Sequence, residues 1–149
     1  MSTITVQQVQ NAVRRYFEAM SDKIPGELSK MYSYDAVVFG PYGPRPDLGR
    51  VWATIRDREY CHPDSTYHFE FTSPIEVQIV ADNVAVATHT FRSVATNVKD
   101  PILGKTLNRK LTDGRGTHVF ILSVEGELLL AHQHLSDICR VPQEVAQRA

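Results

Sequence analysis

The order of the predicted elements places this chain in the α+β class, with helices first and hairpin-connected strands after them. Segments with helical periodicity occupy the N-terminal part, whereas segments with strand-like alternation follow from Thr66 onward. The clearest signal is the segment 116–137, in which two apolar, β-rich runs flank the turn Glu125-Gly126. We therefore expect a cone-shaped fold: three N-terminal helices packed in a strongly bent, mostly antiparallel sheet that encloses a pocket.

The length and composition exclude several classes of protein. A chain of 149 residues has the size of one ordinary domain, predicted over 1–149. Its net charge of −1 argues against nucleic-acid binding, and no apolar run approaches the roughly 20 residues that span a bilayer. The first ten residues lack the pattern of a signal peptide. Cys61 and Cys139 are far apart and form no CxxC motif, which favours reduced thiols and a cytoplasmic protein.

The helices are predicted from capping and periodicity. Thr5 and Gln8 have the spacing of a capping box, and apolar residues recur at helical spacing as far as Met20. Residues 21–26 break this helix, and Pro25 suits the first turn of a second, short helix that would bury Leu28, Met31 and Tyr32. The third helix is predicted over 47–60, where one stripe carries Leu48, Val51, Trp52 and Ile55.

The strands are predicted from alternation between turn residues. A first strand over 35–39 precedes a loop at 40–49 that is rich in glycine and proline. The segment 67–80 alternates but contains Pro74, which indicates an edge position or a bulge. A long strand is expected over 84–96, a connection over 97–108, and a bulge or bend where glycines occur at 113–116.

The register of the final hairpin follows from a two-residue loop in which Val124 faces Glu127. Counting from this loop pairs Leu122 with Leu129, Phe120 with Ala131 and His118 with Gln133 on one face, which we expect to line the interior together with Leu135. The opposite face is also largely apolar, and its residues are Thr117, Val119, Ile121, Leu130, His132 and His134. Because this second face must also be covered, we expect a homodimer through the outer face of the sheet.

Several strings resemble the nuclear-transport-factor-2-like superfamily over nearly the whole chain. THVFIL, a glycine turn and LLLAHQHLSD resemble the end of the SnoaL-like and kinase-association branch. VQQVQNAVRRYFEAMSD and KMYSYDAVVFGPYG resemble ketosteroid isomerase. The resemblance implies the cone-shaped fold. It also implies isomerase, polyketide cyclase, dehydratase or assembly functions, between which fold alone does not decide.

The resemblance to the isomerases implies an oxyanion-stabilising pair. Tyr16 stands where the isomerases carry a tyrosine that donates to the developing enolate oxygen, and His118 stands where they carry a protonated acid. Gly40 stands where they carry the general-base carboxylate, so steroid isomerisation by that route is not expected. The kinase association domain binds carboxylates through arginines, and His118 and Leu135 stand at the matching positions, so that activity is not expected either.

Three other residues are candidate proton acceptors. His68 resembles a strand-start histidine that scytalone dehydratase uses as an acid/base, and the isomerase register points His89 inward. Asp35 lies at a helix-to-strand junction, where a carboxylate more often satisfies backbone donors. Each of the three has this alternative of a purely structural role.

Apolar residues with a polar group are predicted to line the pocket, namely Tyr34, Trp52, Phe120, Gln133 and Leu135. His132 and His134 share a strand face, but no further ligand follows at a suitable spacing, so no metal is expected. The basic residues Arg109, Lys110 and Arg115 are predicted to form a solvated strand end.

The sequence thus predicts an enzyme that needs no cofactor and performs isomerisation, cyclisation or dehydration on a compact carbonyl compound of polyketide-like or steroid-like character. The alternative is a non-catalytic ligand-binding or oligomeric assembly module of the same fold. A deep pocket reached by Tyr16 and a histidine would favour the enzyme. An interior filled by Trp52 and Leu135 would favour the module.

Overall fold

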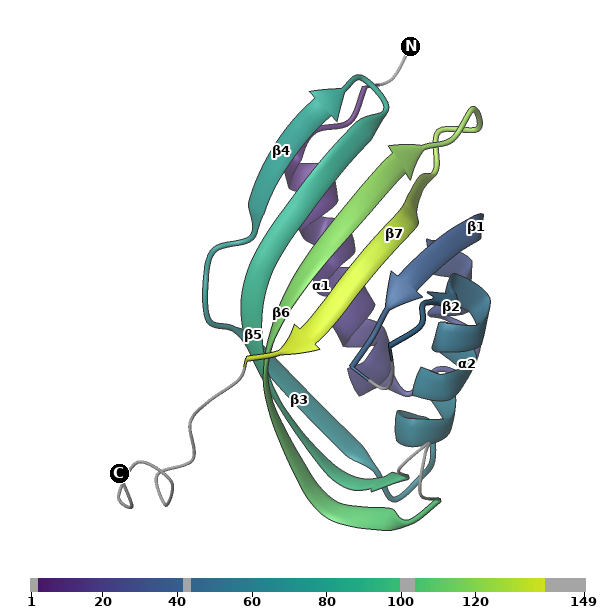
Figure 1. Cartoon of the computed structure of the whole chain (residues 1–149), viewed down its shortest axis with the longest axis vertical. Coiled ribbons are helices and arrows are strands. Elements are labelled where there is room, and N and C mark those ends of the chain that lie inside the picture. Colours follow the sequence, from purple (N-terminus) through teal and green to yellow (C-terminus); the bar gives the residue numbers. More distant parts are fainter. Residues whose placement is uncertain (1–2, 42–43, 100–103, 139–149) are drawn as a thin grey trace.

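The computed structural model describes residues 3–41, 44–99 and 104–138 (Figure 1). Its elements are α1 (Val6–Asp22), η1 (Ser29–Met31), β1 (Tyr32–Phe39), β2 (Asp47–Leu48), α2 (Gly49–Tyr60), β3 (Thr66–Phe71), β4 (Glu76–Ala81), β5 (Val84–Lys99), β6 (Thr106–Leu122) and β7 (Leu128–Asp137). None of the helices in these ranges is long and apolar enough to cross a membrane. Cys61 is a free thiol, and Cys139 lies outside the described residues.

The α+β class is confirmed, but the three helices are reduced to two. α1 begins as expected, with Thr5 and Gln8 forming both hydrogen bonds of the capping box. It ends at Lys23, whose backbone has left-handed angles (φ 54°). The predicted second helix is only the 3-10 turn η1, because Gly26 also has a left-handed backbone (φ +83°) and too few residues remain before β1 for a stable α-helix.

The sheet is mixed and open. The strand order is β2-β1-β7-β6-β5-β3, and β4 also pairs with β5. β1 runs parallel to β7, whereas the other pairs are antiparallel. The predicted segment 67–80 is divided into β3 and β4, with Pro74 in the connection between them, because proline cannot donate a ladder hydrogen bond.

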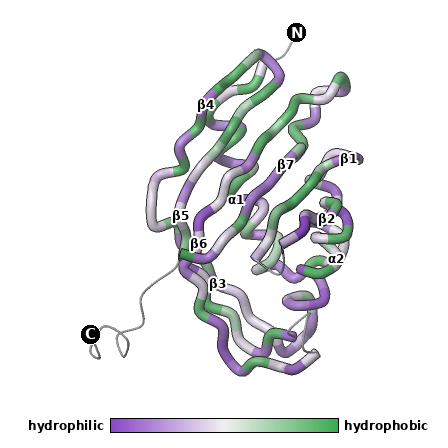
Figure 2. The backbone as a smooth tube through the Cα atoms, viewed as in Figure 1, coloured by the Kyte–Doolittle hydropathy of each residue, from purple (hydrophilic) through white to green (hydrophobic). Residues whose placement is uncertain are grey.

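β5 and β6 are the longest strands, and they carry the bend of the sheet from its upper to its lower part (Figure 1). Both extend into the segment 97–108 that was predicted as a connection, since Val98 pairs with Leu107. The lower end of β6 is mostly hydrophilic, whereas hydrophobic residues are frequent along the upper lengths of β6 and β7 (Figure 2). α1 packs behind the upper sheet, and α2 lies beside β1.

The final hairpin combines a longer turn with a bulge. The turn closes through a hydrogen bond from the Ser123 amide to the Glu127 carbonyl, so Leu122 pairs with Leu128 and not with Leu129. A register shift then follows at Ala131, which restores the predicted pair of His118 with Gln133. The shift turns Leu130, predicted on the outer face, into the core, where it is 1% exposed.

Candidate functional site

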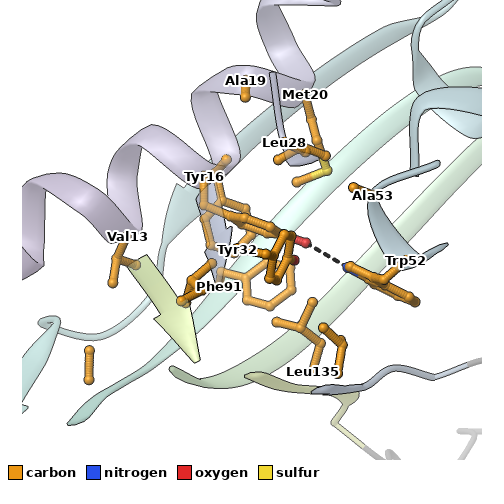
Figure 3. Packing of buried hydrophobic residues seen from close by; sticks show 14 of the residues in the cluster. Val13, Tyr16, Ala19, Met20, Leu28, Tyr32, Trp52, Ala53, Phe91 and Leu135 are labelled. Atoms are coloured by element: carbon orange, nitrogen blue, oxygen red, sulfur yellow. Dashed lines mark hydrogen bonds between the residues drawn. The ribbon is translucent and has the colours of Figure 1, made fainter. Parts of the chain in front are cut away.

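Buried polar side chains form two adjacent sets of hydrogen bonds in the core, which meet where Tyr16 packs against Tyr32. At one end, the Trp52 indole nitrogen donates to the Tyr16 hydroxyl at 3.0 Å (Figure 3). The Tyr16 ring packs edge-on against that of Tyr32, with ring centres 6.5 Å apart. The Tyr32 hydroxyl donates to Oε1 of Gln133 at 2.6 Å. Three elements, α1, α2 and β1, therefore bring their polar groups to one point inside the cone.

The chain continues from Gln133 into two histidines. Nε2 of Gln133 lies 2.9 Å from Nδ1 of His118, and Nε2 of His118 lies 2.8 Å from Nε2 of His89. His118 and Gln133 are fully buried, and His89 is 5% exposed. The fold thus brings Tyr16, His118, His89 and Gln133 together, and it adds Tyr32, which was not among the predicted site residues. The sequence did offer one indication of Tyr32, which was predicted to face inward shortly before the strand at 35–39.

Burial keeps this chain uncharged. Desolvation lowers the pKa of His89 to about 4, and the Thr90 backbone opposes this only weakly. Desolvation lowers the pKa of His118 well below its usual range, and the neighbouring His89 adds to that effect. Desolvation likewise raises the pKa of the Tyr32 hydroxyl well above its usual range. Both imidazoles and the phenol are therefore neutral at pH 7.

Glycines make room for the large side chains of these hydrogen-bonded residues. A Cβ atom on Gly40 would lie 2.3 Å from the Trp52 ring, and one on Gly49 would lie 2.7 Å from the Tyr32 ring. A Cβ atom on Gly116 would lie 2.9 Å from Nε2 of His118 and of His89. No side chain, and so no carboxylate, fits at Gly40 beside Trp52 as it stands. This is the physical counterpart of the missing general base at that position.

The expected pocket inside the cone is not confirmed. At the mouth, a hollow of only about 20 Å³ remains, which is room for about one water molecule. Phe91 and Leu135 form part of its lining, and both are buried. A Cβ atom on Gly116 would also lie 3.2 Å from the Leu135 side chain, so Leu135 is close to both histidines. Because Leu135 also lines the hollow, it lies between the mouth and the His89–His118 pair. Trp52 and Leu135 thus fill the space in which a substrate was expected.

An ion cluster lies at the same mouth. Glu59 is fully buried and lies 3.4 Å from the Arg56 guanidinium and 3.8 Å from the Lys110 ammonium. The Arg56 guanidinium also lies 4.5 Å from the centre of the Trp52 ring. Lys110 was predicted to be part of a solvated strand end. Its place is instead at the mouth, where it lines the hollow and its ammonium reaches Glu59 of α2.

Three predicted site residues lie outside the cone. His68 is exposed because β3 turns the neighbouring Tyr67 inward. Asp35 is exposed, and its Oδ1 accepts a hydrogen bond from Ser33 at 3.3 Å. Tyr34 is 80% exposed and contacts the Arg50 guanidinium at 4.4 Å from the ring centre, so it is not a cavity wall. β1 exposes Tyr34 and Asp35 next to a register shift between Tyr32 and Val37.

The remaining candidates divide between the two faces of the hairpin. Phe120 is buried, and its ring centre lies 6.2 Å from that of His118. His132 and His134 lie on the other face, and the ring centre of each lies 5.9 Å from that of Phe39. Within the described ranges, no group of three or more histidine, cysteine or acidic residues is placed to hold a metal ion.

Solved structures resemble this chain over nearly its full length. A nuclear-transport-factor-2-like superfamily protein from Salmonella enterica superposes with a TM-score of 0.69 at 17% identity, covering 91% of this chain and 92% of the other. The chain has the nuclear-transport-factor-2-like fold.

Other proteins with the nuclear-transport-factor-2-like fold carry functional descriptions. A ketosteroid isomerase-like protein from Erwinia carotovora atroseptica matches with a TM-score of 0.66 at 15% identity, covering 92% of this chain and 100% of the other. A candidate dehydratase from Streptomyces avermitilis matches with a TM-score of 0.69 at 18% identity, covering 91% and 97%. No family model and no curated protein sequence matches the chain. The likeness establishes the fold, and the activity has to be argued from the site.

Proposed function

We propose that this chain is an enzyme that needs no cofactor and acts on a compact carbonyl compound inside the cone, by isomerisation, cyclisation or dehydration. The observation that supports it is the group of buried, hydrogen-bonded polar side chains in the core, made of the pair Trp52–Tyr16 and the chain from Tyr32 through Gln133 and His118 to His89. Buried polar groups are costly, and departures from an apolar core are concentrated at functional sites. The isomerase-like and dehydratase-like descriptions of two proteins with this fold agree with it.

In this proposal Tyr16 donates to the negative charge that develops on the carbonyl oxygen, and His118, whose two ring nitrogens contact Gln133 and His89, contributes to the same stabilisation through His89. The ring centres of Tyr16 and His118 lie 6.1 Å apart, so a small group beside Tyr16 lies close to the histidine pair. A substrate enters from the mouth when Leu135 and Phe91 move aside, since these residues line the hollow there. Of the three proton acceptors predicted from the sequence, only His89 lies inside, and its role depends on which ring nitrogen carries the proton.

The test is exchange of hydrogen for deuterium next to a carbonyl group, which detects enolisation whatever the final product is. The purified protein is incubated in D₂O with cyclic enones and 1,3-diketones, and loss of the α-proton signal is followed by NMR. We expect exchange above the buffer rate, a reduction of about 100-fold in Tyr16→Phe and His118→Ala, and no reduction in the exposed control His134→Ala. Full activity in both interior variants, or no exchange with any compound, would end this proposal.

A second candidate function is favoured by the filled interior. With about 20 Å³ at the mouth, the cone fits a non-catalytic module that assembles through its outer sheet face. Figure 1 shows α1 behind the sheet, and no described element covers the face toward the viewer. That face carries Phe39, Thr117, Val119, Ile121, His132 and His134. The proposed occupant is a second copy of the chain, in an isologous dimer.

Sedimentation velocity tests this assembly independently of activity. We expect dimers at micromolar concentration and monomers in Val119→Lys, because a lysine at the centre of the face would bury a charge in the interface. The matched control is Glu18→Lys on the exposed side of α1, which should leave the dimer intact. A wild-type protein that sediments as a monomer would exclude the dimer.

A further inference from the structure

The buried chain has a single direction of hydrogen-bond donation. The contact of 2.6 Å between Tyr32 and Gln133 is typical of a hydroxyl donating to a carbonyl oxygen, which identifies the Gln133 atom as Oε1. The other amide atom of Gln133 is then the nitrogen, which can only donate. Its partner at 2.9 Å, Nδ1 of His118, must therefore accept.

This assignment determines where each histidine carries its proton. A neutral imidazole has one N–H, so the proton of His118 is on Nε2. That N–H faces Nε2 of His89 at 2.8 Å, and the two rings are nearly coplanar, with 5° between their planes. The contact is thus an in-plane hydrogen bond that His89 accepts through Nε2. The proton of His89 is consequently on Nδ1.

Nδ1 of His89 is the end of the chain. It is buried and has no hydrogen-bond partner of normal geometry among the described residues; the Thr90 backbone, which raises the pKa of this ring, does not meet that geometry. The surrounding rings are Phe17, Phe71 and Phe91, with ring centres 5.4, 5.2 and 5.7 Å from that of His89, and none of them carries an acceptor of ordinary strength. A buried N–H without an acceptor costs free energy and is rare in folded proteins. A ligand that accepts a hydrogen bond from this N–H would remove that cost.

We infer that Tyr32 and Gln133 are positioning residues that hold both histidines in fixed neutral tautomers, so that the Nδ1–H of His89 is a hydrogen-bond donor for a substrate oxygen. The inference rests on the proposed function for the identity of the ligand, a carbonyl compound. It assigns to His89 the role of a donor in the resting protein, and not that of the general base considered from the sequence. The three phenylalanine rings restrict the acceptor to a small group such as a carbonyl oxygen.

The tautomers can be measured without a substrate. Two-bond ¹H–¹⁵N correlation spectra of the ¹⁵N-labelled protein at pH 7 distinguish protonated from unprotonated ring nitrogens. We expect two histidines that are neutral at pH 7, one protonated on Nε2 (His118) and one on Nδ1 (His89). A wild-type His118 with its proton on Nδ1 would overturn the inference, whatever the α-proton exchange shows.

Gln133→Glu tests the positioning role. A carboxylate offers only acceptors, so Nδ1 of His118 must become a donor and its proton pattern must change. We expect this change together with at least a 10-fold loss of α-proton exchange. The control Thr117→Val, next to His118 in the sequence but on the outer face, should keep the wild-type proton pattern and the wild-type exchange rate. Tyr32→Phe should give mixed tautomers, because the Gln133 amide is then free to rotate. An unchanged pattern in both variants would refute the inference. An absence of exchange in the wild type would instead refute the proposed function.

Discussion

His89 and His118 are the two residues whose surroundings differ most from those of the free side chain. Both lie in the core, and their closest polar contact is with each other. Two neutral imidazoles can share one hydrogen bond, whereas two imidazolium ions cannot. The protonated form of either ring is therefore disfavoured by burial and, for His118, also by the adjacent histidine.

This pair predicts a pH-dependent stability. The pKa of His89 falls from 6.5 in the unfolded chain to about 4 in the folded protein, so between these values the unfolded state binds more protons. Stability is therefore fully present above about pH 6.5 and is lost as the pH falls toward 4. At about 1.4 kcal/mol per pKa unit, roughly 2 kcal/mol is lost between pH 7 and pH 5 through His89, and the lowered pKa of His118 adds to the loss in the same direction.

Urea unfolding at pH 7, 6 and 5 measures this loss. In His89→Gln the slope of stability against pH should be clearly smaller, because one titrating group is removed. The exposed control His134→Gln should keep the wild-type slope. A wild-type stability that is constant over this range would show that the histidines are not buried as described.

At the scale of the element, β6 shows what the sequence could and could not predict. A bulge or bend was predicted at 113–116, but β6 pairs with β5 there without a register shift. The role that the structure gives Gly114 and Gly116, room for rings on neighbouring strands, depends on contacts distant in sequence. The predicted pair of His118 with Gln133 is present because two departures cancel: the longer turn shifts the register by one residue, and the bulge at Ala131 shifts it back. Local patterns gave no sign of either departure.

The close contact between Gly114 of β6 and Phe91 of β5 predicts an effect on stability. A Cβ atom there would lie 2.5 Å from the Phe91 ring, so Gly114→Ala must displace that ring from its buried position. We expect a loss of about 1–3 kcal/mol in the free energy of unfolding, measured by urea denaturation. Thr117→Ala, on the outer face of the same strand, should change stability far less. A Gly114→Ala protein as stable as the wild type would show that the interior is not tightly packed there.

For the whole molecule, periodicity and turn residues were sufficient to predict the α+β class and the cone-shaped arrangement of a bent sheet. They could not predict that the cone is filled. Trp52 enters the interior only because Gly40, on another element, lacks a side chain, and such a contact leaves no local pattern. For the same reason Tyr34 and Asp35 were predicted to be at the cavity although β1 exposes them.

The proposed enzyme requires that the interior around Trp52 and Tyr16 admits a small oxygenated molecule. Trp52 is the only tryptophan of the chain, and its indole N–H donates to Tyr16, so one ¹H–¹⁵N indole signal reports on this site. Titration with cyclic enones, 1,3-diketones and a phenol should shift this signal saturably, and Tyr16→Phe should weaken the binding at least 10-fold. An indole signal that no compound in the panel moves, in a protein that sediments as a stable dimer, would contradict the enzyme and favour the assembly module.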